Sequence, residues 1–329
     1  MTSLILVLII SAQRPGATFL LIPPSAKATG MAYAWTAIAD DASANYYNAA
    51  GLAFIKRPSL TVSYFKVLPG LHPEMPYLYL GAVQVINGQY IGFDMIYFSP
   101  GKTQPVIEIG INLGEYTVYR MAIGSNYARK FSDFFSLGLG CKLIYAHLVA
   151  DWVWEKMPEL GIDIGGTGIS YAFDLNLLYK IKPYLSMGLT LHNVGPDISY
   201  TESGSSDPLP LLCRLGLSGK LFEFENLSMT LSTEMTKVLE GMFANTDNSF
   251  GENMRYEFKE AWKAVGMELK SYKILALRTG YFYDCEGDRK GWTFGGGINV
   301  LNLEIDVGID EQIFYFETQS RKLSLTYTF

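Results

Sequence analysis

The last nine residues of the chain alternate between apolar and polar side chains, and this pattern constrains the fold more than any other feature. In residues 321 to 329, one set of alternate positions holds Leu323, Leu325, Tyr327 and Phe329, and the other holds Lys322, Ser324, Thr326 and Thr328. Successive side chains of a β-strand point to opposite faces of its sheet. The pattern therefore predicts a strand with one apolar face, which either a second protein layer or lipid must cover.

The same alternation recurs along most of the chain after residue 58. Segments of about nine to thirteen residues alternate and then break at Gly, Pro, Asn or Asp. The clearest segments are 169–180, 184–192, 226–236 and 302–310. We predict about fourteen strands, with centres near residues 63, 81, 94, 121, 140, 174, 187, 216, 231, 267, 278, 295, 305 and 325. An even number of strands allows an up-and-down barrel to close with both ends on one side, without unpaired edges.

The composition leaves two classes of β protein open. Mean hydropathy is +0.14, and only 18% of the residues are charged. No uncharged apolar run reaches the roughly 18 residues that a membrane-spanning helix needs. The chain is therefore either a large soluble β protein or a membrane barrel, whose strands need only about ten residues each.

Charges and aromatic residues favour the membrane barrel. Charged residues fall in mid-strand on the polar face, where a wet lumen accepts them: Asp174, Arg214, Glu234, Glu268, Arg278, Glu304 and Asp306. Aromatic residues lie towards the strand ends, where a membrane barrel needs them at both interfaces: Tyr77, Tyr79, Tyr97, Tyr119, Tyr127, Tyr145, Tyr171, Tyr179, Tyr281, Tyr283, Trp292 and Tyr327. We predict an all-β fold, a transmembrane β-barrel of the bacterial outer membrane with about 14 antiparallel strands.

The chain divides into three expected parts. Residues 1–12 are expected to form a signal peptide with an apolar core, although no positive side chain precedes that core. Residues 13–57 are rich in Ala and form a small plug or hatch segment, and residues 58–329 form the barrel. The alternative for 13–57 is an N-terminal arm of ordinary turn formers. Two long polar stretches, near 148–167 and 239–263, are expected to be loops, the second with room for a short helix. They are expected to contact partners through Trp152, Trp154 and Trp262.

The N-terminal stretch carries a family resemblance. Residues 17–53 include Gly30-Met31, Ala39-Asp40-Asp41-Ala42 and Tyr46-Tyr47-Asn48-Ala49-Ala50-Gly51-Leu52. This pattern resembles the PorV/PorQ family of outer-membrane proteins, which is similar to the FadL long-chain fatty-acid transporters. The chain departs from the family at Ala49, where the family usually has Pro. Weaker matches follow in order: Leu191 to Pro196, Asp207 to Gly216, and Leu277 to Tyr281.

The resemblance implies positions and roles for several residues. The family motif that would form the plug comprises Gly30, Asp40, Asp41, Asn45, Tyr47, Asn48, Gly51 and Leu52. The final strand resembles the assembly signal of outer-membrane barrels through Leu323, Leu325, Tyr327 and Phe329. Expected partners are outer-membrane lipid, the barrel-assembly machinery, and a large secretion translocon or surface-exposed cargo proteins.

Three functions remain open at this stage. The PorV branch implies a non-enzymatic protein-export or attachment partner in a type IX-like secretion system. The FadL likeness implies instead a transporter of hydrophobic small molecules, with Phe19, Leu20, Leu21 and Ile22 lining an apolar pocket. The third possibility is a barrel that only anchors other surface proteins.

Other classes are disfavoured by the sequence. The net charge is −6, and no run of basic residues forms a patch along the sequence, so we expect no nucleic-acid partner. Three cysteines at wide spacing form neither a disulfide framework nor a metal site. No hydrolase elbow, phosphate-binding loop or zinc-protease motif is present, so we expect no catalytic residue, cofactor or metal.

Overall fold

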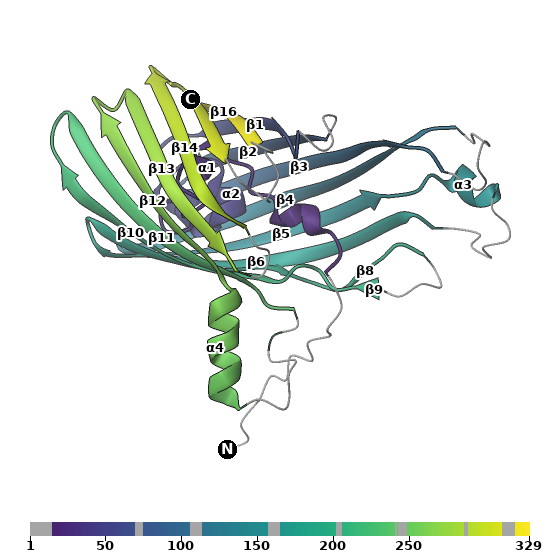
Figure 1. Cartoon of the computed structure of the whole chain (residues 1–329). Coiled ribbons are helices and arrows are strands. Elements are labelled where there is room, and N and C mark those ends of the chain that lie inside the picture. The colour runs from purple at the N-terminus through teal and green to yellow at the C-terminus, as the bar shows by residue number, and fades with distance from the viewer. Residues whose placement is uncertain are drawn as a thin grey trace.

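The computed structural model describes residues 15–69, 75–105, 114–156, 165–201, 206–240, 242, 249–285, 289–310 and 320–329. These residues form a closed barrel of antiparallel strands (Figure 1). Fourteen strands make the wall: β1 (Ser59–Lys66), β2 (Pro76–Ile86), β3 (Gln89–Thr103), β4 (Tyr116–Ser132), β5 (Phe135–His147), β6 (Thr167–Lys182), β7 (Leu185–Val194), β10 (Leu212–Glu223), β11 (Leu227–Val238), β12 (Trp262–Ser271), β13 (Leu275–Asp284), β14 (Arg289–Val300), β15 (Leu303–Asp310) and β16 (Ser320–Thr328).

The strands follow one another around the wall in sequence order. Each pairs with its predecessor, and β1 closes the barrel by pairing with β16. A small hairpin of β8 (Ile198–Ser199) and β9 (Ser206–Asp207) is inserted between β7 and β10. All fourteen strand centres predicted from the alternation fall within these strands, because a two-residue period marks a half-buried strand wherever it is sustained.

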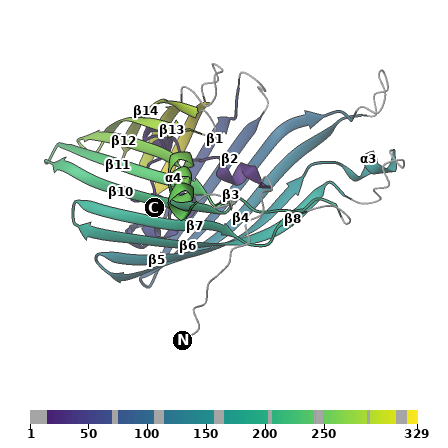
Figure 2. The same cartoon turned by 60° about the horizontal axis from the view of Figure 1, so that its bottom comes forward.

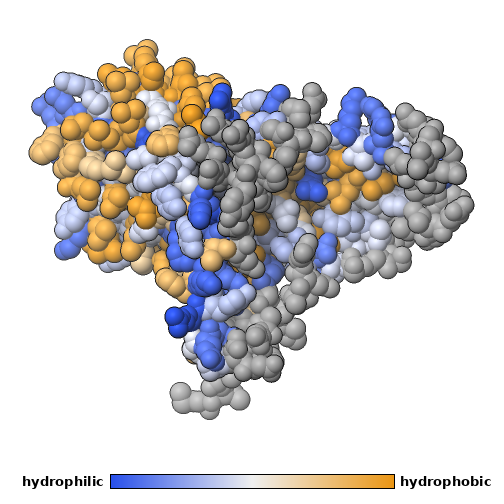
Figure 3. Space-filling model, in the orientation of Figure 1, coloured by the Kyte–Doolittle hydropathy of each residue, from blue (hydrophilic) through white to orange (hydrophobic). Residues whose placement is uncertain are grey.

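The two faces of the wall differ as the alternation predicts. Along β6, the outward side chains Ile169, Tyr171 and Phe173 are 62%, 54% and 52% exposed, whereas Ser170 and Asp174 between them are buried. Hydrophobic side chains cover much of the barrel's outer surface in Figure 3. Large apolar side chains therefore face outward, as a wall in contact with lipid requires.

The two ends of the barrel are unlike. At one end the strands are joined by tight turns, such as Asn87-Gly88 with positive φ at both residues, which suits a two-residue hairpin. Longer connections lie at the other end, including those between β5 and β6 and between β11 and β12. We call these the short-turn end and the long-loop end; in outer-membrane barrels they face the periplasm and the exterior, respectively.

Two helices lie at the long-loop end. They are α3 (Asp151–Glu155) and α4 (Phe250–Glu260). In Figure 1, α4 projects away from the barrel wall, and Figure 2 shows it from the side towards which it projects. A Ser249–Glu252 capping box begins α4. No helix among the described residues is long and apolar enough to cross a membrane.

Residues 15–57 lie inside the barrel, and we call them the inner segment. It contains the short helices η1 (Thr18–Leu21), α1 (Ala26–Gly30), α2 (Ala44–Tyr47) and η2 (Ala49–Phe54). Helix α1 contacts β13 to β16, and η2 contacts β3 to β6, so the segment spans the lumen from wall to wall. The predicted signal peptide at 1–12 lies outside the described residues.

Three residues are placed differently from what the sequence analysis expected. Tyr77 and Tyr79 were expected at a membrane interface, but they point inward and are fully buried against the inner segment. Their positions alternate with Leu78 and Leu80, so apolar residues occupy both faces of this part of β2, and periodicity alone does not assign the faces. Trp262 was expected in a loop, but it is the first residue of β12.

Candidate functional site

The candidate site is the barrel interior, where the inner segment meets the wall. Two asparagines of the family motif hold the segment to the wall. Asn45 Nδ2 donates to the carbonyl oxygens of Ala82 on β2 and Phe93 on β3, at 2.9 and 3.3 Å. Asn48 Nδ2 donates to Leu177 O on β6 at 3.0 Å and to Thr36 O at 2.8 Å. These amides therefore join the inner segment to strands that are distant in the sequence.

An ion-pair cluster holds the other side of the segment. Lys27 Nζ on α1 lies 3.1 Å from Asp41 Oδ2 and 2.6 Å from Glu304 Oε2 on β15. Burial alone lowers the pKa of Lys27, but the nearby carboxylates of Asp41 and Glu304 outweigh it and raise the pKa above its usual value. Lys27 therefore remains charged. It links α1 to Asp41 within the inner segment and to Glu304 in the wall.

The wall continues this cluster. Arg278 on β13 pairs with Glu268 on β12 at 2.7 Å and with Asp306 on β15 at 2.6 Å. Gly30 at the end of α1 packs directly above it: a Cβ there would lie 2.9 Å from both Arg278 Cβ and Gly295 Cα. Glycine at position 30 thus allows the helix to approach the wall closely.

A second buried arginine meets the segment from β10. The guanidinium of Arg214 lies 4.8 Å from the ring centre of Tyr46 and 5.4 Å from that of Tyr47. Beside it, Glu234 Oε2 on β11 accepts hydrogen bonds from the backbone N–H groups of Trp35 and Thr36 at 3.0 and 2.9 Å. Two charged side chains of the wall thus contact the aromatic rings and the backbone of the inner segment.

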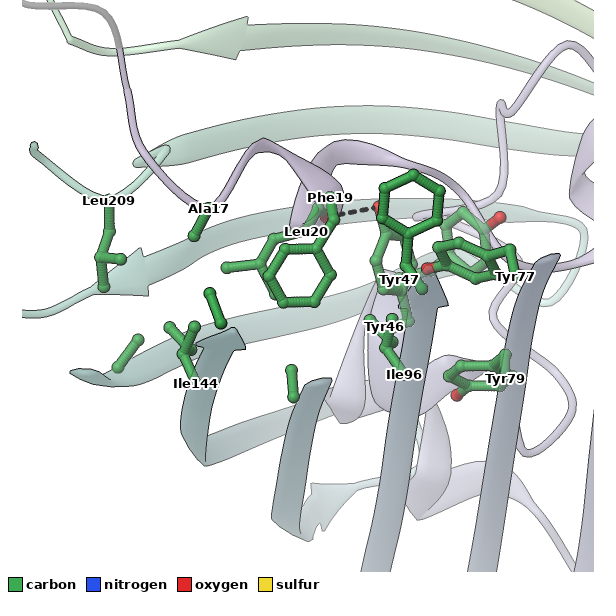
Figure 4. Close-up of a cluster of buried hydrophobic side chains, with 14 of the residues drawn as sticks. Ala17, Phe19, Leu20, Tyr46, Tyr47, Tyr77, Tyr79, Ile96, Ile144 and Leu209 are labelled. Carbon is green, nitrogen blue, oxygen red and sulfur yellow. Dashed lines mark hydrogen bonds between the residues drawn. The ribbon is translucent and has the colours of Figure 1, made fainter. Parts of the chain in front are cut away.

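Aromatic and aliphatic side chains fill the space around these polar contacts. Figure 4 shows Phe19, Tyr46 and Tyr47 of the inner segment beside Tyr77 and Tyr79 of the wall. Tyr46 Oη donates to Leu20 O at 3.0 Å, and Tyr77 Oη donates to Ile22 O at 2.9 Å. The tyrosines therefore bury large rings and still satisfy their hydroxyls.

Above this cluster lies a cavity of about 530 Å³. Its apolar lining includes Phe19, Leu21, Ile22, Phe65, Phe98 and Phe282, and its charged lining includes Arg120, Arg214, Glu234, Arg289, Asp310 and Lys322. Three of the four residues expected to line a pocket do so. The fourth, Leu20, lies in the buried cluster instead.

The predicted lumen charges all lie on the inner side of the wall. Six of the seven are buried, and Glu304 is half-buried. The expectation of a wet lumen is wrong for the six, since the inner segment and opposite charges surround them. Asp174, for example, forms an ion pair with Lys142 at 2.8 Å, lies 3.3 Å from His192 Nδ1, and accepts from Asn193 N at 2.8 Å.

The remaining motif residues have separate roles. Asp41 Oδ1 accepts from Ser43 N at 2.8 Å, whereas Asp40 is exposed at the short-turn end of the segment. A Cβ at Gly51 would collide with Ala39 O, and Leu52 is fully buried. Ala49, which replaces the family's Pro, begins η2 after the extended residue Asn48.

The three tryptophans expected to contact partners are in two places. Trp152 and Trp154 lie on α3 at the long-loop end, where Trp152 contacts Tyr116 and Trp154 Nε1 donates to Gly165 O at 2.8 Å. Trp262 instead lines the interior cavity, and Arg289 lies 4.8 Å from its ring centre.

The final strand has the predicted faces. Leu323, Leu325, Tyr327 and Phe329 are all exposed on the outer surface, and β16 pairs with both β1 and β15. The sequence analysis found no run of basic residues, but the fold does bring basic residues together. Basic residues that are scattered along the chain converge at the short-turn end, as described below. Among the described residues, no group of three or more His, Cys, Asp or Glu side chains could hold a metal ion.

Comparisons with known proteins follow from this geometry. The family model "Type IX secretion system protein PorV" matches residues 10–243. No protein of curated function matches the sequence. Among solved structures, the chain is similar to the Ralstonia pickettii toluene transporter TbuX (TM-score 0.56, 11% identity, 93% of this chain and 98% of that chain). It is also similar to a Pseudomonas aeruginosa FadL homologue (TM-score 0.54, 14% identity, 94% and 99%) and to the CymD monoaromatic hydrocarbon channel (TM-score 0.57, 12% identity, 94% and 98%). At these identities the likeness establishes a shared fold alone.

Proposed function

The chain belongs to the PorV family of type IX secretion system proteins, and from this membership we propose that it is a non-enzymatic partner in protein export at the bacterial outer membrane. In this role it receives exported proteins at the cell surface and passes them to a translocon or to an attachment machinery. The family match over residues 10–243 is the observation that carries the proposal.

The geometry supports binding over free conduction. The inner segment contacts the wall on both sides through α1 and η2, which suits a barrel that does not serve as an open pore. The long-loop end presents α3 and α4, and Met254 and Phe258 on α4 are 45% and 61% exposed. Exposed apolar side chains on loop helices are suited to contact another protein.

Site-specific photocrosslinking in the native host tests this role. A photoreactive amino acid at Met254 or Trp152 should yield crosslinks to a large outer-membrane subunit or to secreted proteins that share a C-terminal domain. The same group at Leu175, which is 51% exposed on the lipid-facing side of β6, is the matched control. Equal crosslinking at all three sites, or normal surface display in a strain that lacks the protein, would contradict the proposal.

The cavity favours a second candidate, a conduit or receptor for hydrophobic small molecules. Its volume of about 530 Å³ and the aliphatic and aromatic side chains of its lining fall within the range of small-molecule pockets. Replacing Ala264, which lines the cavity, by Phe should abolish binding of a fluorescent apolar probe. Val265→Phe is the control because Val265 is 50% exposed on the opposite face of β12. Unchanged probe binding in Ala264→Phe would rule out this role for the cavity.

A further inference from the structure

The short-turn end of the barrel gathers basic side chains that are far apart in the sequence. Six of them surround the point where the inner segment leaves the lumen: Lys56, Arg57, Lys130, Lys180, Lys270 and Lys273. We call this set the basic mouth. It arises because the tight turns and the exit of the inner segment all meet at one end.

The cations of the mouth point over the lumen, not into lipid. The Nζ atoms of Lys180 and Lys130 lie 3.6 and 5.6 Å from the ring centre of Phe54, the last residue of η2. On the outer surface at this end, the exposed side chains include Phe131, Phe134 and Tyr184. The mouth cations are thus on the inner side and aromatic residues are on the outer side.

A polar pocket of about 440 Å³ opens at the mouth. Five cations line it (Lys27, Lys56, Arg57, Lys270 and Lys273), together with three carboxylates (Asp40, Asp41 and Glu304). The Lys27 charge is matched by Asp41 and Glu304, and Lys270 is paired with Glu268 at 3.0 Å. For Lys56, Arg57 and Lys273, the described residues provide no ion pair, so positive charge is in excess.

A buried hydroxyl in the same pocket also lacks a partner. Ser59, the first residue of β1, lines the pocket and is 5% exposed, and its Oγ has no hydrogen-bond partner within the described part of the chain. Asn299, Thr326 and Thr328 add further polar groups to the lining. A ligand with several oxygen acceptors would satisfy both the hydroxyl and the unpaired cations.

The described segments of the long-loop end carry charges of both signs. They hold the acidic residues Asp197, Asp207, Glu240, Glu252, Glu257 and Glu260, and also the basic residues Lys237, Arg255, Lys259 and Lys263. Lys237 lies 2.6 Å from Glu257 and 3.1 Å from Glu260. The unpaired cations of the mouth therefore favour binding of anions at the short-turn end.

We propose that the basic mouth is a docking site for an acidic, extended segment of a periplasmic protein. Several cations at different depths match a chain with repeated carboxylates better than a single small anion, and complementary charge favours such encounters. The inward direction of Lys130 and Lys180 favours a protein segment over phospholipid headgroups, which lie outside the wall. This site is at the other end of the barrel from the proposed export contacts, so either proposal can fail alone.

Fluorescence anisotropy with the full-length protein in uncharged detergent tests the proposal. The probe is a fluorescein-labelled deca-glutamate peptide, with deca-lysine and a neutral Gly-Ser peptide as controls. The wild-type protein should bind the acidic probe only, and added salt should weaken the binding. The triple variant Lys56→Gln, Arg57→Gln and Lys273→Gln should bind at least about tenfold more weakly.

A charge-matched variant is the control. Lys66→Gln, Lys102→Gln and Lys290→Gln remove the same charge from exposed positions at the long-loop end, and binding should stay within about twofold of wild type. Lysine acetylation of the wild-type protein gives a measurement that requires no variant: the acidic peptide should protect Lys56 and Lys273 but not Lys66 or Lys102.

Four results would overturn the proposal. The first three are absence of acidic-peptide binding by the wild-type protein, equal losses of binding in the two triple variants, and equal protection of lysines at both ends. The fourth is that nanodiscs of the wild-type protein retain phosphatidylglycerol, and those of the mouth triple variant do not, while the acidic peptide fails to bind. The basic mouth would then be a lipid site.

Discussion

Lys27 shows how a single residue holds the inner segment in place. It is 4% exposed and lies between Asp41 of the same segment and Glu304 of the wall. A buried charge is tolerated only when it is paired, so its position fixes where α1 lies relative to β15. The sequence carries a weak signal of this role: Lys27 is the only charged residue among the small and apolar residues 16–39.

Lys27→Met should loosen the inner segment. Removing the cation leaves the buried carboxylate of Asp41 and the half-buried carboxylate of Glu304 without it, and breaking a buried pair in this way costs about 3–5 kcal/mol. The folded barrel should then migrate as unfolded protein at a lower heating temperature, and residues 15–57 should become sensitive to protease. Lys66→Met, at an exposed position, serves as the control, and equal behaviour of the two variants would mean that the ion pair does not anchor the segment.

Single residues were the hardest level to predict from the sequence. The small residues and asparagines of 17–53 were identified because their chemistry suits close packing. Their contacts with the wall were not predicted, since Tyr77 on β2 and Arg214 on β10 meet Tyr46 and Tyr47 only after the barrel has closed. The basic mouth was missed for the same reason: Lys56, Lys180 and Lys273 are separated by about a hundred residues each.

At the scale of the strand, the phase of the alternation decides which side chain meets lipid. Leu231 is 40% exposed on the outer face of β11, and its neighbour Thr230 lies on the inner face. Leu231→Arg should cost about 2–4 kcal/mol if it lies near the bilayer midplane, whereas Thr230→Arg should cost far less. Unfolding by urea in lipid vesicles measures both, and equal costs would show that the phase is wrong.

The terminal strand gives a second prediction for an element. β16 must pair with β1 to close the wall. Tyr327 on β16 and Phe329 directly after it are both exposed. Replacing both by Ser should block assembly in the outer membrane while export across the inner membrane continues. The strand would lose the aromatic side chains that anchor it at the membrane interface. It would also lose the aromatic residues that resemble the assembly signal. The accumulated protein should remain in the periplasm without heat-modifiable migration, and normal insertion would disprove the role.

Strands were the most predictable elements, and the connections between them were the least. A two-residue period identifies a strand without knowledge of its neighbours, as in 169–180, which lies within β6. Loop boundaries have no such period. Trp262 was placed in a loop because it follows a run of charged residues, but that run forms α4, and β12 begins directly after it.

At the scale of the whole molecule, the barrel combines a lipid-facing wall with an interior filled by its own N-terminal segment. The wall follows from alternation, and its closure removes edges that lipid cannot hydrogen-bond. The interior follows from the ion pairs and amides that tie residues 15–57 to opposite sides of the wall. Both features leave the short-turn end and the long-loop end free to contact two different compartments.

Spin-label accessibility along β6 tests the central claim most directly. Single cysteines at residues 169 to 179, introduced after replacement of Cys141, Cys213 and Cys285, would be labelled in lipid vesicles and exposed to oxygen, which concentrates in lipid. We expect oxygen collisions to be frequent at the odd-numbered positions and rare at the even-numbered ones, in a strict two-residue alternation. Odd-numbered positions shielded from oxygen, or no alternation at all, would show that these apolar side chains meet protein and not a membrane.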